Sequence, residues 1–147
     1  MLPLALLATA GEARTPLGAY EGWAAFRDER PTRCFAIAEP HRGLRGSRPY
    51  LTVSRWPASG VTGQVHVRLA APVPAGRRAT LSIGGNRFDL AATGLDAWPA
   101  DRRADARIIA AMRGGGRLTV SGAGASLSWT LTGAASAIDA ALLGCVR

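Results

Sequence analysis

The sequence predicts a mainly β protein, a single antiparallel β-sandwich or barrel-like domain with one internal helix at about 101–113 and a short C-terminal helix at about 134–143. Three observations support this prediction. The length of 147 residues is typical of one domain. Short apolar, β-branched and aromatic runs recur between glycine, proline and charged turns. No linker or repeat interrupts residues 14–147, which we expect to form the β-rich domain.

The first predicted strands follow an irregular lead-in. Residues 14–22 contain a proline and two glycines, so we expect no regular structure there. A short strand is predicted at 23–26, and the apolar run 34–38 predicts a buried one. Residues 50–56, Tyr-Leu-Thr-Val-Ser-Arg-Trp, are rich in β-branched and aromatic side chains and predict a third strand.

The next strand shows strict alternation. Val65, Val67 and Leu69 fall on one face, and His66 and Arg68 fall on the other. This period of two is typical of a half-buried strand. We expect His66 on the polar face to be exposed and without a function.

The remaining strands form a hairpin and a closing pair. Residues 79–83 and 87–90 flank Gly-Gly-Asn, which predicts a tight hairpin turn. Two further strands are expected at 117–121 and 126–131, around a Gly-Ala-Gly turn. The total of about seven strands suggests a sandwich or a barrel.

The internal helix is predicted from a stripe of apolar residues at helical spacing. The stripe consists of Ala104, Ile108, Ile109 and Met112. Asp101 can serve as its N-cap, and three glycines after residue 113 end it. The C-terminal helix is predicted from an alanine-rich run.

The first thirteen residues resemble a signal peptide. A short apolar run, Leu2 to Ala8, is followed by small residues, with cleavage expected after Ala10 or Ala13. The alternative is a loosely packed N-terminal arm. No apolar run approaches the ~20 residues of a membrane-spanning helix, so we expect no transmembrane segment. The expected location is the periplasm or the extracellular space.

Cys34 and Cys145 are the only two cysteines. In an oxidising compartment they can pair, closing a loop of about one hundred residues, which the chain-entropy model values at about 4 to 5 kcal/mol. The alternative is a pair of buried free thiols. Two cysteines and two histidines also make a metal site unexpected, and no cofactor is predicted.

The net charge is +8, and all 18 basic residues are arginines. Codon usage in a GC-rich genome would explain the high positive charge as well as an anionic partner would. The best candidate for an anion site is a loop in which Arg42, Arg45 and Arg48 alternate with Gly43 and Gly46. Arginine pairs with phosphate, sulfate and carboxylate, so a phosphorylated lipid or an acidic glycan is a sensible ligand; the alternative is a solvated loop. Nucleic acid is disfavoured by the expected export and by the lack of interleaved aromatic residues.

The sequence carries no recognisable catalytic motif. There is no Gly-x-Ser-x-Gly element, and only His41 and His66 could act as a base. A glycosidase would need two facing carboxylates. Four carboxylates are available, and most of them are expected to be capping or solvated residues: Asp89, Asp96, Asp101 and Asp105.

A series of short motifs runs from residue 81 to residue 138. They are the hairpin Leu-Ser-Ile to Phe-Asp-Leu, the helix Asp-Ala-Arg-Ile-Ile-Ala-Ala-Met-Arg, the strand Arg-Leu-Thr-Val and the segment Leu-Ser-Trp-Thr-Leu-Thr-Gly-Ala-Ala-Ser-Ala-Ile. In these motifs, and in Trp23 and Cys34, the chain resembles the invasion-associated locus B family of exported alphaproteobacterial proteins. Ala134 stands where that family usually has an aromatic residue. The resemblance implies a periplasmic or secreted β-rich protein with no known enzymatic activity.

We therefore expect an exported, non-enzymatic protein that binds an anionic envelope component or a protein partner. Two alternatives remain, a small periplasmic hydrolase using carboxylates or His41, and a structural envelope component without a small ligand. A deep polar cleft that gathers His41 or His66 with two carboxylates would favour the hydrolase. Convergence of Arg42, Arg45 and Arg48 on one surface would favour anion binding.

Overall fold

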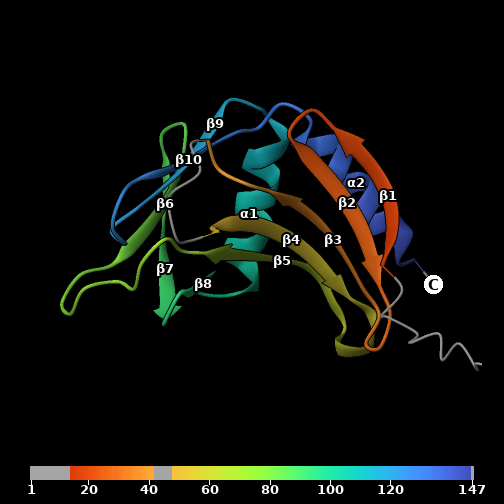
Figure 1. The fold of residues 1–147 in the computed structure, drawn as a ribbon, viewed down its shortest axis with the longest axis horizontal. Coiled ribbons are helices and arrows are strands. Elements are labelled where there is room, and N and C mark those ends of the chain that lie inside the picture. The colour runs from red at the N-terminus through yellow and green to blue at the C-terminus, as the bar shows by residue number, and fades with distance from the viewer. Residues whose placement is uncertain (1–13, 42–47, 147) are drawn as a thin grey trace, which may run out of the picture.

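The structure, a computed structural model, describes residues 14–41 and 48–146. These residues form ten strands and two α-helices (Figure 1), and the prediction of a mainly β, antiparallel fold is confirmed. The strands are β1 (Thr15–Tyr20), β2 (Trp23–Asp28), β3 (Arg33–Ala38), β4 (Tyr50–Trp56), β5 (Val61–Arg68), β6 (Ala79–Ile83), β7 (Asn86–Thr93), β8 (Asp96–Pro99), β9 (Arg117–Ser121) and β10 (Leu127–Thr130). The helices are α1 (Arg102–Arg113) and α2 (Ala134–Gly144), and a short 3-10 turn spans Pro57–Ser59.

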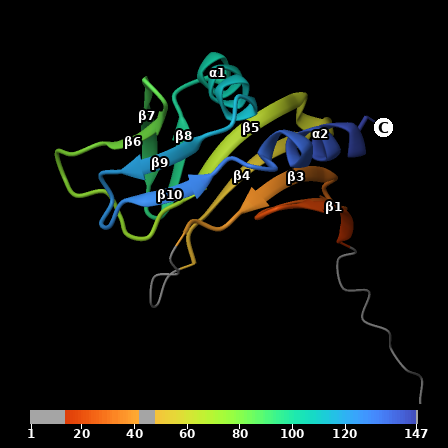
Figure 2. The same ribbon diagram turned by 90° about the horizontal axis from the view of Figure 1, so that it is seen from above.

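All ten strands belong to one continuous sheet, in the order β1-β2-β3-β4-β5-β8-β7-β6-β9-β10. Two groups of strands, β1–β5 and β6–β10, meet where β5 pairs with β8 through only two residue pairs. Figures 1 and 2 show these groups turned relative to each other, so the sheet is strongly curved. The strands form one bent sheet with β1 and β10 at its ends, so the sandwich or barrel of the prediction is not confirmed.

Both helices cover the same face of this sheet. Cross-strand pairing puts Cys34, Val53 and Val65 on one face, together with Gly63 two residues before Val65. A disulfide between Cys34 and Cys145, the residue after α2, ties this helix to the face. The side chain of Ile109 in α1 packs directly over Gly63. The core lies between the helices and this face, and its largest fully buried members include Trp23, Trp129, Leu51, Leu81, Ile108, Met112 and Ile138.

Two tryptophans join the far end of the sheet to its beginning. Trp129 of β10 donates from Nε1 to the carbonyl of Ala38 at 2.9 Å, and Trp23 of β2 donates to the carbonyl of Thr130 at 2.9 Å. Because both indoles are buried, these bonds satisfy groups that would otherwise be costly to bury. They hold the end of β10 beside the ends of β2 and β3.

The element predictions were accurate in the middle of the chain. β4, β6 and β9 have the predicted bounds, and α1 starts one residue after its predicted N-cap. Asp101 accepts a hydrogen bond from the amide of Ala104 at 2.8 Å, as an N-cap should. α2 begins at the predicted position, after Gly133, whose φ is 88°. A Cβ there would lie 2.2 Å from the carbonyl oxygen of Tyr20, so the close approach requires glycine.

Two strands were not predicted, and the count of about seven was too low. The lead-in expected at 14–22 is the edge strand β1, in which Pro16 is accommodated beside a break in the register between Pro16 and Gly18. β8 lies where the sequence indicated only a change of pattern before the helix. Its four residues are too few to show a period.

The predicted pairing of the cysteines is present as a Cys34–Cys145 disulfide. It joins β3 to the residue that follows α2. Within the described ranges 14–41 and 48–146, neither helix has the length and apolar character needed to cross a bilayer.

Candidate functional site

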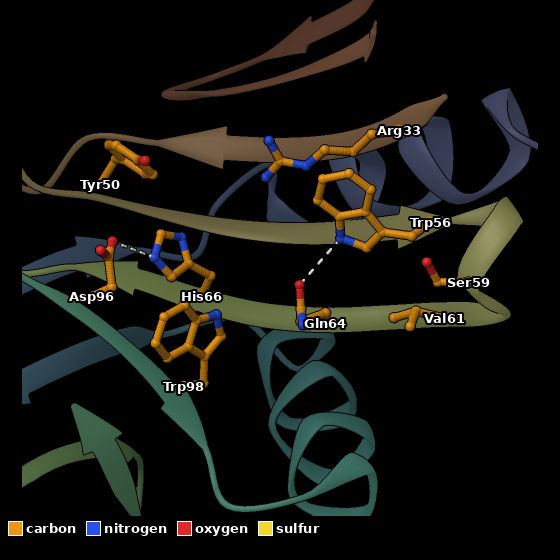
Figure 3. Close-up of a pocket in the computed structure, with 9 residues that line it drawn as sticks. All are labelled: Arg33, Tyr50, Trp56, Ser59, Val61, Gln64, His66, Asp96 and Trp98. Atoms are coloured by element: carbon orange, nitrogen blue, oxygen red, sulfur yellow. Dashed lines mark hydrogen bonds and ion pairs between the residues drawn. The ribbon is translucent and has the colours of Figure 1, made fainter. Parts of the chain in front are cut away.

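An open groove of about 600 Å³ lies on the face of β3, β4, β5 and β8 that the helices leave uncovered (Figure 3). Alternation along the strands points the side chains from β3, β4 and β8, and those of Gln64 and His66 in β5, away from the core. Ser59 in the 3-10 turn and Val61 at the start of β5 complete the lining. The lining residues are Arg33, Tyr50, Trp56, Ser59, Val61, Gln64, His66, Asp96 and Trp98.

Three rings form a row along one side of the groove. The centroid of His66 lies 5.8 Å from that of Tyr50 in an edge-to-face arrangement, and 5.2 Å from that of Trp98. The row crosses three adjacent strands, since Tyr50 is on β4, His66 on β5 and Trp98 on β8. Figure 3 shows Trp56 and Arg33 at the other side of the hollow.

His66 is held by a carboxylate. Its Nε2 lies 2.9 Å from Oδ1 of Asp96, and Arg68 donates from Nη1 to both oxygens of that carboxylate, at 3.1 and 3.0 Å. The hydrogen bond from His66, followed by that from Arg68, lowers the pKa of Asp96 from its ordinary value. The expectation that His66 is an exposed residue was therefore wrong, because its side chain is only 15% exposed and lines the groove.

Arg33 is the most unusual charge in the groove. Its guanidinium carbon lies 4.2 Å from the centroid of Phe35 and 5.0 Å from that of Trp56. Nε and Nη2 both donate to the hydroxyl of Ser54, at 3.0 and 2.8 Å. Burial lowers the pKa of Arg33 from its ordinary value. Among residues 14–41 and 48–146, no carboxylate forms an ion pair with it.

A second cleft, of about 300 Å³, lies where β10 meets the ends of β2 and β3. Its walls carry Glu21, Glu39 and His41, and the Nε2 of His41 contacts the hydroxyl of Thr130. This cleft matches the combination of one histidine and two carboxylates that the hydrolase alternative required. All three side chains are exposed, however, and in the described part of the chain neither glutamate hydrogen-bonds to His41.

The predicted arginine loop is only partly placed. Arg48 is exposed and lies just before β4. Arg42 and Arg45 lie outside the described residues, so convergence of the three arginines stays a prediction.

The other predicted carboxylates have structural roles. Asp101 caps α1, and the exposed Asp89 pairs with Arg78 at 3.2 Å. Asp105 accepts a hydrogen bond from the amide of Val65 at 2.9 Å, and burial raises its pKa from the ordinary value. In the ranges that the structure covers, no three His, Cys, Asp or Glu side chains gather closely enough to hold a metal.

Sequence reasoning missed Arg33 and Asp96 as groove residues. A usable signal was present in β4, where Tyr50, Thr52, Ser54 and Trp56 alternate on the face opposite Leu51 and Val53. Aromatic and hydroxyl side chains on the face away from the core suggest a surface for binding rather than for packing.

Comparisons with models of protein families, with curated proteins and with solved structures find no match to this chain.

Proposed function

We propose that this is an exported, non-enzymatic protein that binds a ligand in the groove of β3, β4, β5 and β8, at the cell envelope or outside the cell. The observation that carries the proposal is the groove itself. It offers the rings of Tyr50, Trp56 and Trp98 together with the guanidinium of Arg33, which forms no ion pair within residues 14–41 and 48–146. Concave sites with aromatic walls and a few convergent polar groups are the usual form of small-ligand sites.

Export is supported by the disulfide. A Cys34–Cys145 bond persists in oxidising compartments and is rare in the bacterial cytosol. The test is expression of the full chain in a Gram-negative host, followed by fractionation and mass determination. Export predicts periplasmic protein cleaved after Ala10 or Ala13, with thiols that react with alkylating reagent only after reduction. Full-length cytosolic protein with two reactive thiols would contradict it.

We also propose a distant relationship to the invasion-associated locus B family. The hairpin β6–β7, the helix α1, the strand β9 and the step from β10 into α2 follow the order of the motifs on which the resemblance is based. An experimental structure of a family member tests this. The same ten-strand order is expected, and a different strand order would remove the relationship.

Binding in the groove is tested by NMR on the isotope-labelled, disulfide-bonded protein. The probes are deproteinised glycan and phospholipid fractions of a bacterial envelope. Shifts are expected at the amides of Tyr50, His66 and Trp98, and Trp98→Ala should abolish them. Shifts confined to residues around Arg48, retained in Trp98→Ala, would move the site to the arginine loop.

The hydrolase alternative has one observation in its favour, the cleft that joins Glu21, Glu39 and His41. A panel of chromogenic esters, glycosides and phosphoesters tests it. Turnover that is lost in His41→Ala would support a hydrolase and would contradict the non-enzymatic proposal. A structural envelope role without a small ligand predicts no shifts with any soluble fraction.

A further inference from the structure

We infer that the ligand of the groove is an acidic saccharide, and that Arg33 binds its carboxylate or sulfate group. This inference rests on the proposed function and adds the chemical class of the ligand. It depends on three features of the groove, which are a cation without an ion pair in the described part of the chain, a neutralised carboxylate and separated aromatic faces.

The first feature is the state of Arg33. Half-buried charges are normally paired, because desolvation of an unpaired charge is costly. Here Phe35 and Trp56 flank the guanidinium, and Ser54 accepts from two of its three nitrogens. Nη1 has no hydrogen-bond partner in the described parts of the chain. The neighbouring carboxylate of Asp28 receives two bonds from Arg14 instead, at 2.7 and 3.0 Å. An anionic ligand would supply the missing counter-charge.

The second feature is the balance of charge around the groove. The titratable and charged groups that line it are Arg33, Tyr50, His66 and Asp96, with Arg68 behind Asp96. Beside Arg33 lie Asp28 and Arg14, whose opposite charges form an ion pair with each other. Asp96 is already neutralised by hydrogen bonds from Arg68 and His66. The groove is therefore positive at its Arg33 side, and it would attract an anion rather than repel one.

The third feature is the arrangement of the rings. Trp98 and Trp56 lie on opposite sides of the hollow in Figure 3, with polar groups between them. Gln64 accepts from Nε1 of Trp56 at 3.1 Å, which leaves its amide nitrogen to donate to a ligand. A sugar ring combines an apolar face, which can stack on an indole, with hydroxyls at its edge, which can hydrogen-bond to the polar groups between the two indoles. A lipid chain suits it poorly, because Val61 is the one aliphatic side chain among the groove residues that the structure describes.

The experiment is calorimetric titration of the oxidised protein with matched probes. The probes are hexagalacturonate, its methyl ester, a heparin-derived hexasaccharide and inorganic phosphate. The two acidic hexasaccharides distinguish carboxylate from sulfate recognition. The methyl ester has the same rings without the charge, and phosphate has the charge without rings. We expect at least one acidic hexasaccharide to bind, the ester to bind at least tenfold more weakly, and phosphate not to bind.

Variants assign the effect to residues. Arg33→Gln is expected to weaken binding of the acidic probe by roughly tenfold to a hundredfold, the usual range for losing a hydrogen bond to a charged group. Binding of the methyl ester should stay unchanged in this variant. Arg33→Lys, which keeps the charge without the planar fork, should fall between the two. Arg77→Gln, an exposed arginine before β6, is the matched control and should bind like the parent.

The outcomes are distinguishable. Equal binding of acid and ester, or full affinity in Arg33→Gln, would overturn the role of Arg33. No binding of any hexasaccharide would overturn the saccharide class, while NMR shifts at Trp98 with an envelope fraction would still support the groove as the site. Loss of binding in a triple Arg42, Arg45 and Arg48→Gln variant, with Arg33→Gln unaffected, would place the anion site on the loop. Thermal unfolding of Arg33→Gln and Arg33→Lys checks that both variants are folded.

Discussion

Cys34, buried in β3, is bonded to Cys145, which lies 111 positions later and directly follows α2. The bond fastens the C-terminal helix to the sheet near the centre of the β1–β5 group. The chain-entropy model gives about 4 to 5 kcal/mol for a loop of this length.

We predict that Cys34→Ala/Cys145→Ala lowers the free energy of unfolding by about this amount. Urea denaturation of the parent with and without reductant, beside the double variant, measures it. Reductant should destabilise the parent and leave the double variant unchanged. If the free energies of unfolding of the parent and the double variant differ by less than about 1 kcal/mol, the noncovalent contacts of α2 hold this helix on the sheet without the disulfide.

Two arginines flank Cys34 in the sheet and donate to the last carbonyls of α2. Arg55 donates to the carbonyl of Leu142 at 3.1 Å, and Arg27 to that of Gly144 at 2.8 Å. Cationic side chains at a helix C-terminus donate to its free carbonyls and are attracted by the partial negative charge of the helix dipole there. We predict that Arg55→Met, which keeps the apolar stem, costs about 1 kcal/mol. Urea denaturation and hydrogen exchange at the end of α2 test this, with Arg77→Met as a control that should change neither. Unchanged exchange in Arg55→Met would mean that the disulfide and the hydrogen bond from Arg27 hold this end without Arg55.

The turn between β1 and β2 has two residues, Glu21 and Gly22, between the paired Tyr20 and Trp23. Glu21 has φ of 56°, in the left-handed region that asparagine and glycine adopt more easily than glutamate does. We predict that Glu21→Asn raises the free energy of unfolding by about 0.5 to 1 kcal/mol. Glu39→Asn is the control, since it removes a carboxylate from the same cleft without relieving a left-handed backbone. Equal gains in both variants would instead attribute the effect to charge.

The sequence indicated the elements more accurately than the site. Alternation predicted the half-buried strand that carries Val65 and Val67, and a polar cap followed by an apolar stripe predicted α1, because both signals are local. The groove is not local. Arg33, His66 and Trp98 come from β3, β5 and β8, and only the order of strands in the sheet brings them together. The two cysteines were the one long-range contact that the sequence could suggest, because a chain with only two cysteines allows a single disulfide pairing.

The carboxylate of Asp105 links α1 to β5 by accepting the amide of Val65 at 2.9 Å. Its pKa is raised in the folded state because burial disfavours the charged form, an effect that the hydrogen bond from Val65 only partly offsets. A raised pKa means that the folded protein binds this proton more tightly than the unfolded chain does. The ionised group therefore opposes folding at neutral pH. This opposition decreases as the pH falls through the raised pKa, and it is gone below the ordinary pKa of the unfolded chain.

We predict that Asp105→Asn, which keeps the acceptor oxygen without the charge, raises the urea midpoint at pH 7. The gain over the parent should shrink toward zero as the pH is lowered, because the parent then carries a neutral acid at the same position. Asp105→Ala should instead lower stability by about 1 to 3 kcal/mol, since the amide of Val65 loses its partner. Denaturation of the three proteins at several pH values measures both effects. A gain for Asp105→Asn that grows on acidification would contradict the raised pKa, and equal stability of the alanine and asparagine variants would show that the hydrogen bond to Val65 contributes nothing.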